Sequence, residues 1–403
     1  IHNLINYNGP VMTDSGAFQL MGYGSVDVSN EEITKFQESI GVNIGVFLDV
    51  PIANGTYEET KNALNTTISR AKENISLRGN NDLMWAGPIQ GGKYLDLISE
   101  SAKIMGNLPF QIHAIGSVVP LLENYEYLTV VKMITTVKKI LPYNRPIHLF
   151  GAGHPMIFAL SVYLGVDLFD SAAYWLFAKS GRYMTSSGSY HLADLDYFPC
   201  GCVYCSSTSP EEVKKLRKDE KILFLAKHNL SASFIELNII KQAIKDGRLW
   251  NLVLQRSTAH PSLYLAVQFL IDPNIVSFLE KSSSISYKKS RLYSHLWSIS
   301  DPLIMRFRTR TLNRFPILHK NCVIYTDKLP DKFIGENIQK ILLHPIFGLI
   351  SSEWAVIYPI MQHLSFISEF NDNLLDFVQK WTSKYQNKFD KIFSDTEKKF
   401  SIK

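Results

Sequence analysis

The chain has 403 residues, of which 46% are hydrophobic and 20% are charged, and its formal net charge is +5. This composition is ordinary for a soluble globular protein, and the length allows two or more domains. No apolar run reaches 18 residues and the first ten residues lack a signal-peptide pattern, which argues against a membrane span and a secretory signal. The mildly basic charge permits a polyanionic partner without requiring one.

Residues 1–190 alternate short apolar runs with helical patterns. We predict strands at residues 44–48, 84–89, 111–115, 147–150 and 166–169, and helices at residues 30–40, 57–77, 94–105 and 127–140. Strands separated by helices of this length favour a parallel βα architecture. We therefore expect an α/β fold with a TIM (β/α)8 barrel as the catalytic core over residues 1–190. A doubly wound sheet is the alternative that the pattern leaves open.

The rest of the chain changes in composition along its length. Residues 191–275 are expected to hold a zinc-binding subdomain and the last barrel helices, with helical patterns at 234–244 and 262–271. The polar stretch 280–289 has the composition of a linker. Residues 290–403, rich in aromatic residues, Lys and Ile, are expected to form a smaller α+β accessory region.

Polar residues or glycines follow several of the apolar runs. Asp14, Asp49 and Asp170 lie at or just after such runs, as do Gln90 and Gly116. In a (β/α)8 barrel the carboxyl ends of the strands converge on one pocket. A lone aspartate at such a position also caps the helix that follows, so that structural role is the alternative for each of them.

These strand-end residues suggest a type of chemistry. A carboxylate serves as a nucleophile or as a general base, and Asp and Gln accept hydrogen bonds from ring N–H and amino groups. Phe18, four residues after Asp14, either stacks on a planar heterocycle or packs in the core. The residues alone thus predict a barrel enzyme that uses carboxylates on a flat, polar heterocycle.

Three of the four cysteines fall within six residues. They are Cys200, Cys202 and Cys205, and His228 follows after 22 intervening residues. Three thiolates and one imidazole form the ligand set of a closed, tetrahedral zinc site, in which no position stays open for catalysis. The alternative is a group of buried thiols beside a surface histidine. The metal-type spacing also favours a reducing cytoplasm over a disulfide framework.

Six segments in this order resemble the tRNA-guanine transglycosylases. They are TDSGAFQ, FLDVP, GPIQGG, HAIGSVVP, GVDLFDSAAY and the cysteine–histidine cluster, over about residues 8–265. Members of this family exchange a guanine in tRNA for a 7-deazaguanine by double displacement. DSGAFQ, HAIGSVVP and FDSAAY resemble the archaeal branch, the tRNA-guanine(15) transglycosylases of archaeosine biosynthesis. The resemblance implies a cytoplasmic enzyme that takes 7-cyano-7-deazaguanine (preQ0) and tRNA, holds one structural Zn²⁺ and needs no membrane.

The resemblance also implies a role for individual residues. Asp170 matches the nucleophile, and Asp14 matches the second catalytic carboxylate, although some descriptions of the archaeal branch name that residue as the nucleophile. Ser15 and Phe18 match pocket residues, with Phe18 stacked on the base.

Further matches concern the base edge and the metal. Asp49 and Gln90 match groups that hydrogen-bond the edge of the base. The loop whose backbone faces the 7-substituent matches Gly116, Ser117 and Val118. The zinc ligands match Cys200, Cys202, Cys205 and His228.

Four basic residues lie close in sequence to these motifs and are candidates for contacts to the RNA backbone. They are Arg145, Lys179, Arg182 and Arg256. The alternative for each of them is a solvated surface charge.

Two departures from the family pattern give further expectations. The family has a segment before DSGAFQ that supplies the opening strands of the barrel, and it ends in a PUA-type RNA-binding module. Neither is recognisable here. We therefore expect that the opening strands are lost by N-terminal truncation or come from another chain, and that the PUA module is a separate subunit or is lost by a second truncation. The resemblance also implies a homodimer, because the family commonly dimerises through the zinc region. A non-catalytic tRNA-binding subunit, or an archaeosine-synthase-like paralogue of the same fold, remain alternatives.

Overall fold

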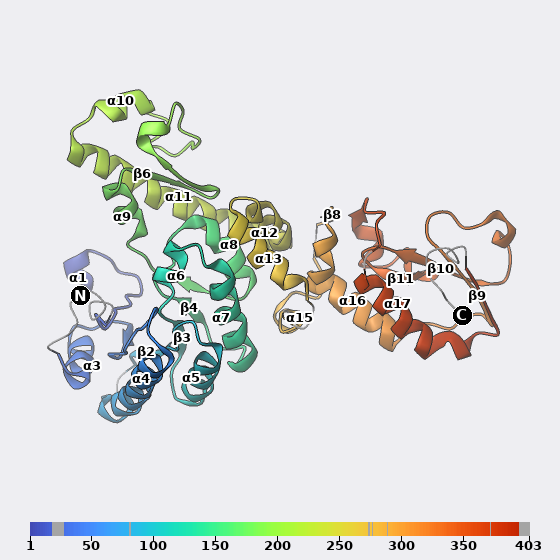
Figure 1. Cartoon of the computed structure of the whole chain (residues 1–403), viewed down its shortest axis with the longest axis horizontal. Coiled ribbons are helices and arrows are strands. Elements are labelled where there is room, and N and C mark those ends of the chain that lie inside the picture. The colour runs from blue at the N-terminus through green and yellow to red at the C-terminus, as the bar shows by residue number, and fades with distance from the viewer. Residues whose placement is uncertain are drawn as a thin grey trace. The chain divides into compact units, whose positions relative to one another are not determined.

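The computed structural model describes residues 1–17, 28–79, 82–272, 275, 277–287, 289–370 and 372–394. The chain forms two compact units, whose elements are drawn in Figure 1. The first comprises residues 1–241 and 252–267, and the second comprises residues 242–251 and 268–403. In the described part of the chain, no helix has both the length and the apolar character that crossing a membrane requires.

The first unit is built on a five-stranded parallel sheet. Its strands are β1 (Ile44–Val46), β2 (Met84–Ile89), β3 (Ile112–Ile115), β4 (Ile147–Leu149) and β5 (Leu168–Phe169), and they neighbour one another in that order. Met12 adds a parallel bridge to Ile44, on the side of β1 away from β2. The predicted α/β class is therefore confirmed. A doubly wound sheet reverses its strand order at a switch point, and the order of these five strands does not reverse. Closure of the sheet into an eight-stranded barrel stays a prediction.

Helices follow the strands and pack side by side. They are α3 (Asn30–Ser39), α4 (Tyr57–Leu77), α5 (Leu95–Asn107), the short α6 (Val119–Glu123), α7 (Tyr127–Ile140) and α8 (Pro155–Tyr163); α1 (His2–Ile5) precedes them all. Helix α3 contacts α4, α4 contacts α5, and α5 contacts α7, as Figure 1 shows beside the strands. Helices α3 and α4 both start with a capping box, Ser29 with Glu32 and Thr56 with Glu59. The predicted helix ranges agree with these bounds to within two residues.

Strand β1 ends earlier than the sequence predicts. The apolar run extends to Leu48, and Phe47 and Leu48 are indeed buried. However, the Gln37 side chain exchanges two hydrogen bonds with the backbone of Val46, at 2.8 and 2.7 Å, and Asn30 Oδ1 accepts from Leu48 N at 3.1 Å. Gln37 thus occupies both backbone polar groups of the last residue of β1, and Asn30 takes the N–H of Leu48 beyond the strand, so these groups are satisfied without further strand pairing.

A mostly helical segment follows the sheet within the first unit. It contains α9 (Ala173–Lys179), the antiparallel hairpin β6 (Arg182–Thr185) and β7 (Gly188–His191), α10 (Pro210–Lys215), the long α11 (Lys218–Asp246), α12 (Leu249–Ser257) and α13 (Pro261–Gln268). Its apolar centre includes Tyr183, Leu192, Val213 and Leu225. Helices α11 and α12 belong to both units, because residues 242–251 are part of the second unit.

The second unit has a mixed four-stranded sheet in the order β11-β10-β9-β13. The strands are β9 (Asn321–Tyr325), β10 (Gln339–His344), β11 (Gly348–Ser351) and β13 (Lys391–Ser394); β9 runs parallel to β10 and β13, and β11 is antiparallel to β10. Helices α16 (Pro302–Asn313) and α17 (Asp372–Tyr385) pack on β11, and Trp381 and Phe377 of α17 lie in the core with Cys322 of β9. Helix α15 (Leu279–Ser282) and the pair of β8 (Leu292–Tyr293) with β12 (Leu364–Ser365) also belong to this unit.

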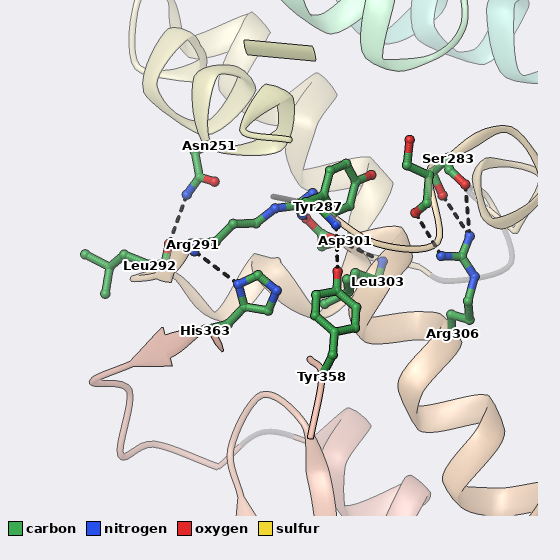
Figure 2. Close-up of polar contacts among 11 residues, drawn as sticks. Asn251, Ser283, Tyr287, Arg291, Leu292, Asp301, Leu303, Arg306, Tyr358 and His363 are labelled. Carbon is green, nitrogen blue, oxygen red and sulfur yellow. Dashed lines mark hydrogen bonds and ion pairs between the residues drawn. The ribbon is translucent and has the colours of Figure 1, made fainter. Parts of the chain in front are cut away.

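A buried ion pair in the second unit joins the residue before β8 to the residue before α16 (Figure 2). Arg291 Nη1 is 2.6 Å from Asp301 Oδ2, both side chains are almost fully buried, and the Arg291 guanidinium lies 3.7 Å from the ring centre of Tyr287. Nearby, Arg306 donates to the carbonyl oxygens of Glu280 and Ser283. Part of the stretch expected to be a linker is therefore held against α16 by charge-assisted hydrogen bonds.

Candidate active site and metal centre

A cavity of about 1000 Å³ opens at the carboxyl ends of the parallel strands. Asp14 follows the Met12 bridge, and the other polar residues follow β1, β2, β3 and β5 in turn. Six of the predicted catalytic and base-binding residues line this cavity, namely Asp14, Asp49, Gln90, Gly116, Ser117 and Asp170. The fold thus brings together side chains that are separated by up to 156 residues (170 − 14) in the chain, as the convergence of parallel strands requires.

Three of these residues form a chain of hydrogen bonds. Gln90 Nε2 donates to Asp49 Oδ2 at 2.6 Å, and Ser117 Oγ donates to Gln90 Oε1 at 2.7 Å. A Cβ atom on Gly116 would lie 2.2 Å from Gln90 Nε2, so the glycine makes room for this amide. Ser117 adopts a left-handed backbone with φ of 61°, a conformation that L-residues adopt rarely and mostly where the surrounding structure imposes it. The amide of Gln90 is therefore held in one orientation.

Asp49 is the most deeply buried carboxyl group of the site, with 3% of its surface exposed. Burial raises its pKa to about 7, and the hydrogen bond from Gln90 opposes this rise. Ser15 Oγ lies 3.5 Å from Asp49 Oδ1, which is a weak contact. Near neutral pH, Asp49 therefore exchanges readily between its protonated and ionised forms.

Asp170 has a different environment. His148 Nε2 lies 2.9 Å from Asp170 Oδ1, and the backbone N–H of Gly151 donates to the same oxygen at 2.8 Å. Burial raises the pKa of Asp170, but the contacts from His148 and Gly151 outweigh burial and hold it below its usual value. The carboxyl side chain is still 57% exposed because it faces the open cavity. Asp170 is thus an ionised carboxylate that a ligand can reach.

The pKa of Asp14 shifts in the opposite direction to that of Asp170. Burial raises its pKa, the hydrogen bond from Ser15 N at 2.8 Å opposes the rise, and the negative charge of Asp170 adds to it. Two carboxyl groups whose pKa values are driven apart by their surroundings are suited to different roles, one as a base or nucleophile and the other as an acid. The cavity therefore holds both an ionised carboxylate and a carboxyl group that retains its proton more strongly.

Of the three other predicted pocket residues, two do not line the cavity and one falls outside the described residues. Val118 is fully buried and Ser15 is 3% exposed, and neither lines the cavity. Phe18 falls in the segment 18–27, outside the described residues.

The sequence did not predict that His148, Tyr125 and His260 line this cavity as well. His148 carried a usable signal, because a titratable side chain in the middle of the apolar run 147–150 is unusual for a strand.

The four predicted metal ligands lie together. The Sγ atoms of Cys200, Cys202 and Cys205 and a ring nitrogen of His228 are all within 4.8 Å of one another. His228 Nδ1 is 3.6 Å from Cys202 Sγ and 3.3 Å from Cys205 Sγ. Ligands of a tetrahedral zinc ion would be roughly 3.6 Å apart, given the usual Zn–S and Zn–N lengths. This donor set therefore fits one metal ion.

The surroundings of His228 support the same conclusion. Its Nε2–H donates to the carbonyl oxygen of Met184 at 2.9 Å, so Nδ1 faces the cysteines without a hydrogen. Metal-bound histidines usually carry such a second hydrogen bond, which fixes the tautomer. Tyr183 stacks on the imidazole at 3.5 Å, and its hydroxyl lies 3.2 Å from Cys205 Sγ. Helix α11 brings His228 to the cysteine loop.

Two of the basic residues near the motifs have partners. Arg256 makes a paired contact with Glu236, at 2.8 and 2.9 Å, and Glu236 is almost fully buried. Arg256 therefore ties α12 to α11, and its charge is already neutralised. Arg182 lines the cavity, and its guanidinium donates to Ser189 Oγ at 3.3 Å.

Comparison with known proteins agrees with this geometry. The family model described as queuine tRNA-ribosyltransferase matches residues 1–262. A tRNA-guanine(15) transglycosylase of Methanococcus aeolicus is 42% identical over 95% of this chain and 62% of its own length. The proteins of that name from Thermococcus onnurineus and Methanocaldococcus jannaschii are 42% and 40% identical, over 90% and 95% of this chain and 58% and 61% of their own lengths. The chain thus spans about three fifths of the length of these relatives.

Proposed function

Since this chain belongs to the queuine tRNA-ribosyltransferase family of tRNA-guanine transglycosylases, we propose that it exchanges a guanine in tRNA for a 7-deazaguanine base. The observation that carries the proposal is the convergence of Asp14, Asp49 and Asp170 in one cavity at the strand ends. The name shared by its relatives, tRNA-guanine(15) transglycosylase, and the DSGAFQ and FDSAAY motifs support guanine 15 of the D-loop as the target. They also support preQ0 as the incoming base, in archaeosine biosynthesis.

The reaction proceeds by two displacements at ribose C1′. The ionised carboxylate of Asp170 attacks C1′, the glycosidic C–N bond breaks, and an ester joins Asp170 to the ribose. Guanine leaves after taking a proton, for which Asp14 is the donor. The incoming base then gives a ring N–H proton back to Asp14, and its nitrogen attacks C1′ and releases the carboxylate of Asp170. One C–N bond replaces another, so no external energy source is needed.

Asp49 and Gln90 are placed to read the edge of the base. An ionised Asp49 accepts hydrogen bonds from the ring N–H and the amino group of guanine or preQ0, and the Gln90 side chain lies beside it at 2.6 Å. Ser117, which donates to Gln90, fixes which atom of that amide faces the base. Together they select a purine-like edge that carries donors.

The pKa of Asp49 gives this binding a pH dependence. Because burial raises that pKa to about 7, lowering the pH from 8 to 6 protonates the carboxyl and removes an acceptor. We expect the Kd for preQ0, measured by isothermal titration calorimetry, to rise about tenfold over this range, since each pH unit below the pKa costs up to about tenfold. The variant Asp49→Asn should bind weakly with a flat profile. A flat profile for the unmodified protein would contradict the role given to Asp49.

The cysteine–histidine cluster is proposed to hold one structural Zn²⁺. All four ligands come from the protein, so the ion leaves no position for substrate, and it would join the loop 200–205 to α11. The exposed side of α11 carries Leu223, Leu230, Phe234, Ile235 and Ile239, each at least 41% exposed. Apolar surface of this kind marks an interaction site, and we propose that a second copy of the chain covers it. A separate PUA-domain subunit remains the proposed further RNA-binding partner.

Binding of tRNA requires that the target nucleotide leaves its stack. Extruding a base from folded RNA costs a few kcal/mol, and contacts to the phosphates make binding sensitive to salt. Arg182 lies at the cavity and is the candidate for such a contact, whereas Arg256 is occupied by Glu236.

Incorporation of radiolabelled guanine or preQ0 into transcribed tRNA tests the function directly. We expect label to enter wild-type tRNA, and we expect none in tRNA that carries adenine at position 15. Tight binding of tRNA without any incorporation would identify a non-catalytic subunit instead.

A further inference from the structure

The cavity also contains a group of aromatic residues that takes no part in the hydrogen-bonded chain of Asp49, Gln90 and Ser117. The rings of Tyr125 and His260 are nearly parallel, with an angle of 10° and 4.4 Å between their centroids. Tyr127 meets the edges of both rings, at 6.0 Å from Tyr125 and 6.1 Å from His260. All three residues line the same cavity as the catalytic carboxylates. We call Tyr125 and His260, with Tyr127 as their support, the aromatic platform.

The platform belongs to the catalytic edge of the sheet. Tyr125 lies at the end of the connection from β3 to α7, which begins with Gly116 and Ser117, and Tyr127 is the first residue of α7. His260 comes from the turn between α12 and α13, 135 residues further along (260 − 125). Two distant segments thus place flat rings beside the same cavity. Its volume of about 1000 Å³ is far larger than one purine base needs.

The rings are held in place rather than loosely packed. Tyr127 is buried with 3% of its surface exposed. The backbone N–H of Ser262 donates to His260 Nδ1 at 3.1 Å, which orients the imidazole. Tyr125 has a left-handed backbone with φ of 58°, and its turn is closed by hydrogen bonds from Tyr125 N to Leu122 O and from Glu126 N to Leu121 O. This conformation is a marked outlier for a bulky residue, and such strain persists where the surrounding structure imposes it.

The platform has the chemistry of a stacking site. Tyr125 is 42% exposed although it is aromatic and stacked, so part of its surface is open to a ligand. Aromatic faces bind nucleobases of any sequence by stacking, whereas they offer little to a phosphate. A flipped target nucleotide brings its neighbours in the strand close to the mouth of the cavity.

We propose that the aromatic platform is a second subsite, which stacks a nucleobase adjacent to the exchanged nucleotide and holds the RNA strand open. The inference rests on the proposed function, because it assigns the partner of the platform from the tRNA that the carboxylates act on. The platform takes no part in breaking or forming the glycosidic bond. Its contribution is to the binding of tRNA and not to the binding of the free base.

The test compares variants of the full chain on tRNA and on free base. Tyr125→Asn removes the ring and suits a left-handed backbone, and Tyr125→Phe keeps the ring and is the matched control. Loss of one base–aromatic stack weakens binding about 5- to 150-fold. We expect Tyr125→Asn and His260→Leu to raise the KM for tRNA at least fivefold, with the Kd for preQ0 unchanged and Tyr125→Phe close to wild type. An unchanged KM, or an equal loss of preQ0 binding, would overturn the inference.

An abasic substrate identifies the stacked base. In tRNA lacking the base on one side of the target nucleotide, the penalty of Tyr125→Asn should disappear, because the partner of the ring is already gone. If the penalty stays complete with either neighbour removed, the platform does not bind an adjacent base. A wild-type chain that exchanges no base at all would instead contradict the proposed function. Thermal melting of Tyr125→Asn and His260→Leu separates loss of the subsite from loss of folding.

Discussion

Replacing Asp170 with asparagine should lower base exchange at least about 1000-fold while binding of preQ0 stays within about threefold of wild type. The amide has the shape of the carboxylate but cannot form an ester with ribose C1′, and losing a catalytic nucleophile costs this much or more. His148 and Gly151 contact the Asp170 carboxylate at 2.9 and 2.8 Å. An amide of the same shape occupies the same position against them, so we expect the substitution to leave the rest of the cavity in place. Steady-state incorporation of labelled guanine into tRNA measures the loss.

Asp14→Asn is the matched control, because it changes the second carboxyl group of the same cavity. We expect it to slow the exchange as well, but to leave the nucleophile able to react. Denaturing electrophoresis of enzyme mixed with labelled tRNA should therefore show a covalent adduct with wild type and Asp14→Asn, and none with Asp170→Asn. The reverse pattern would make Asp14 the nucleophile and would overturn the roles that their opposite pKa shifts support.

Loss of a metal ligand is expected to have the largest effect on stability. Cys202→Ala removes one of four donors and leaves Cys200, Cys205 and His228 to hold an ion that requires four. Structural zinc sites contribute on the order of 10 kcal/mol of apparent binding free energy. We therefore expect the variant to lose its zinc, and its Tm to fall by at least about 10 °C. Elemental analysis per chain and thermal melting with and without a chelator measure both effects.

Cys322→Ala is the control for this experiment. Cys322 is buried, like Cys202 and Cys205, but it belongs to β9 of the second unit and not to the cluster. Its loss should cost about 1–2 kcal/mol of core packing and leave the zinc content at one ion per chain. Equal zinc content in Cys202→Ala and wild type would show that the cluster is not the metal site.

Much of the local structure could be predicted from the residues. Helices α4 and α7 have the predicted bounds because their apolar periodicity is regular, and the capping box of Thr56 and Glu59 marks the start of α4. The cysteine cluster was predictable because three of its ligands lie within six residues. The end of β1 was not, because Asn30 of another element takes the backbone N–H of Leu48, just beyond the strand.

The sequence by itself determined which elements form, which aspartates follow them and which four residues can share a metal, since these depend on short spacings along the chain. Only the tertiary structure decided that His148 contacts Asp170, that Ser117 orients Gln90, and that Tyr125 stacks on His260. Each of these contacts joins residues on different segments. Strand register and loop closure set their distances, and no local pattern of residue types encodes them.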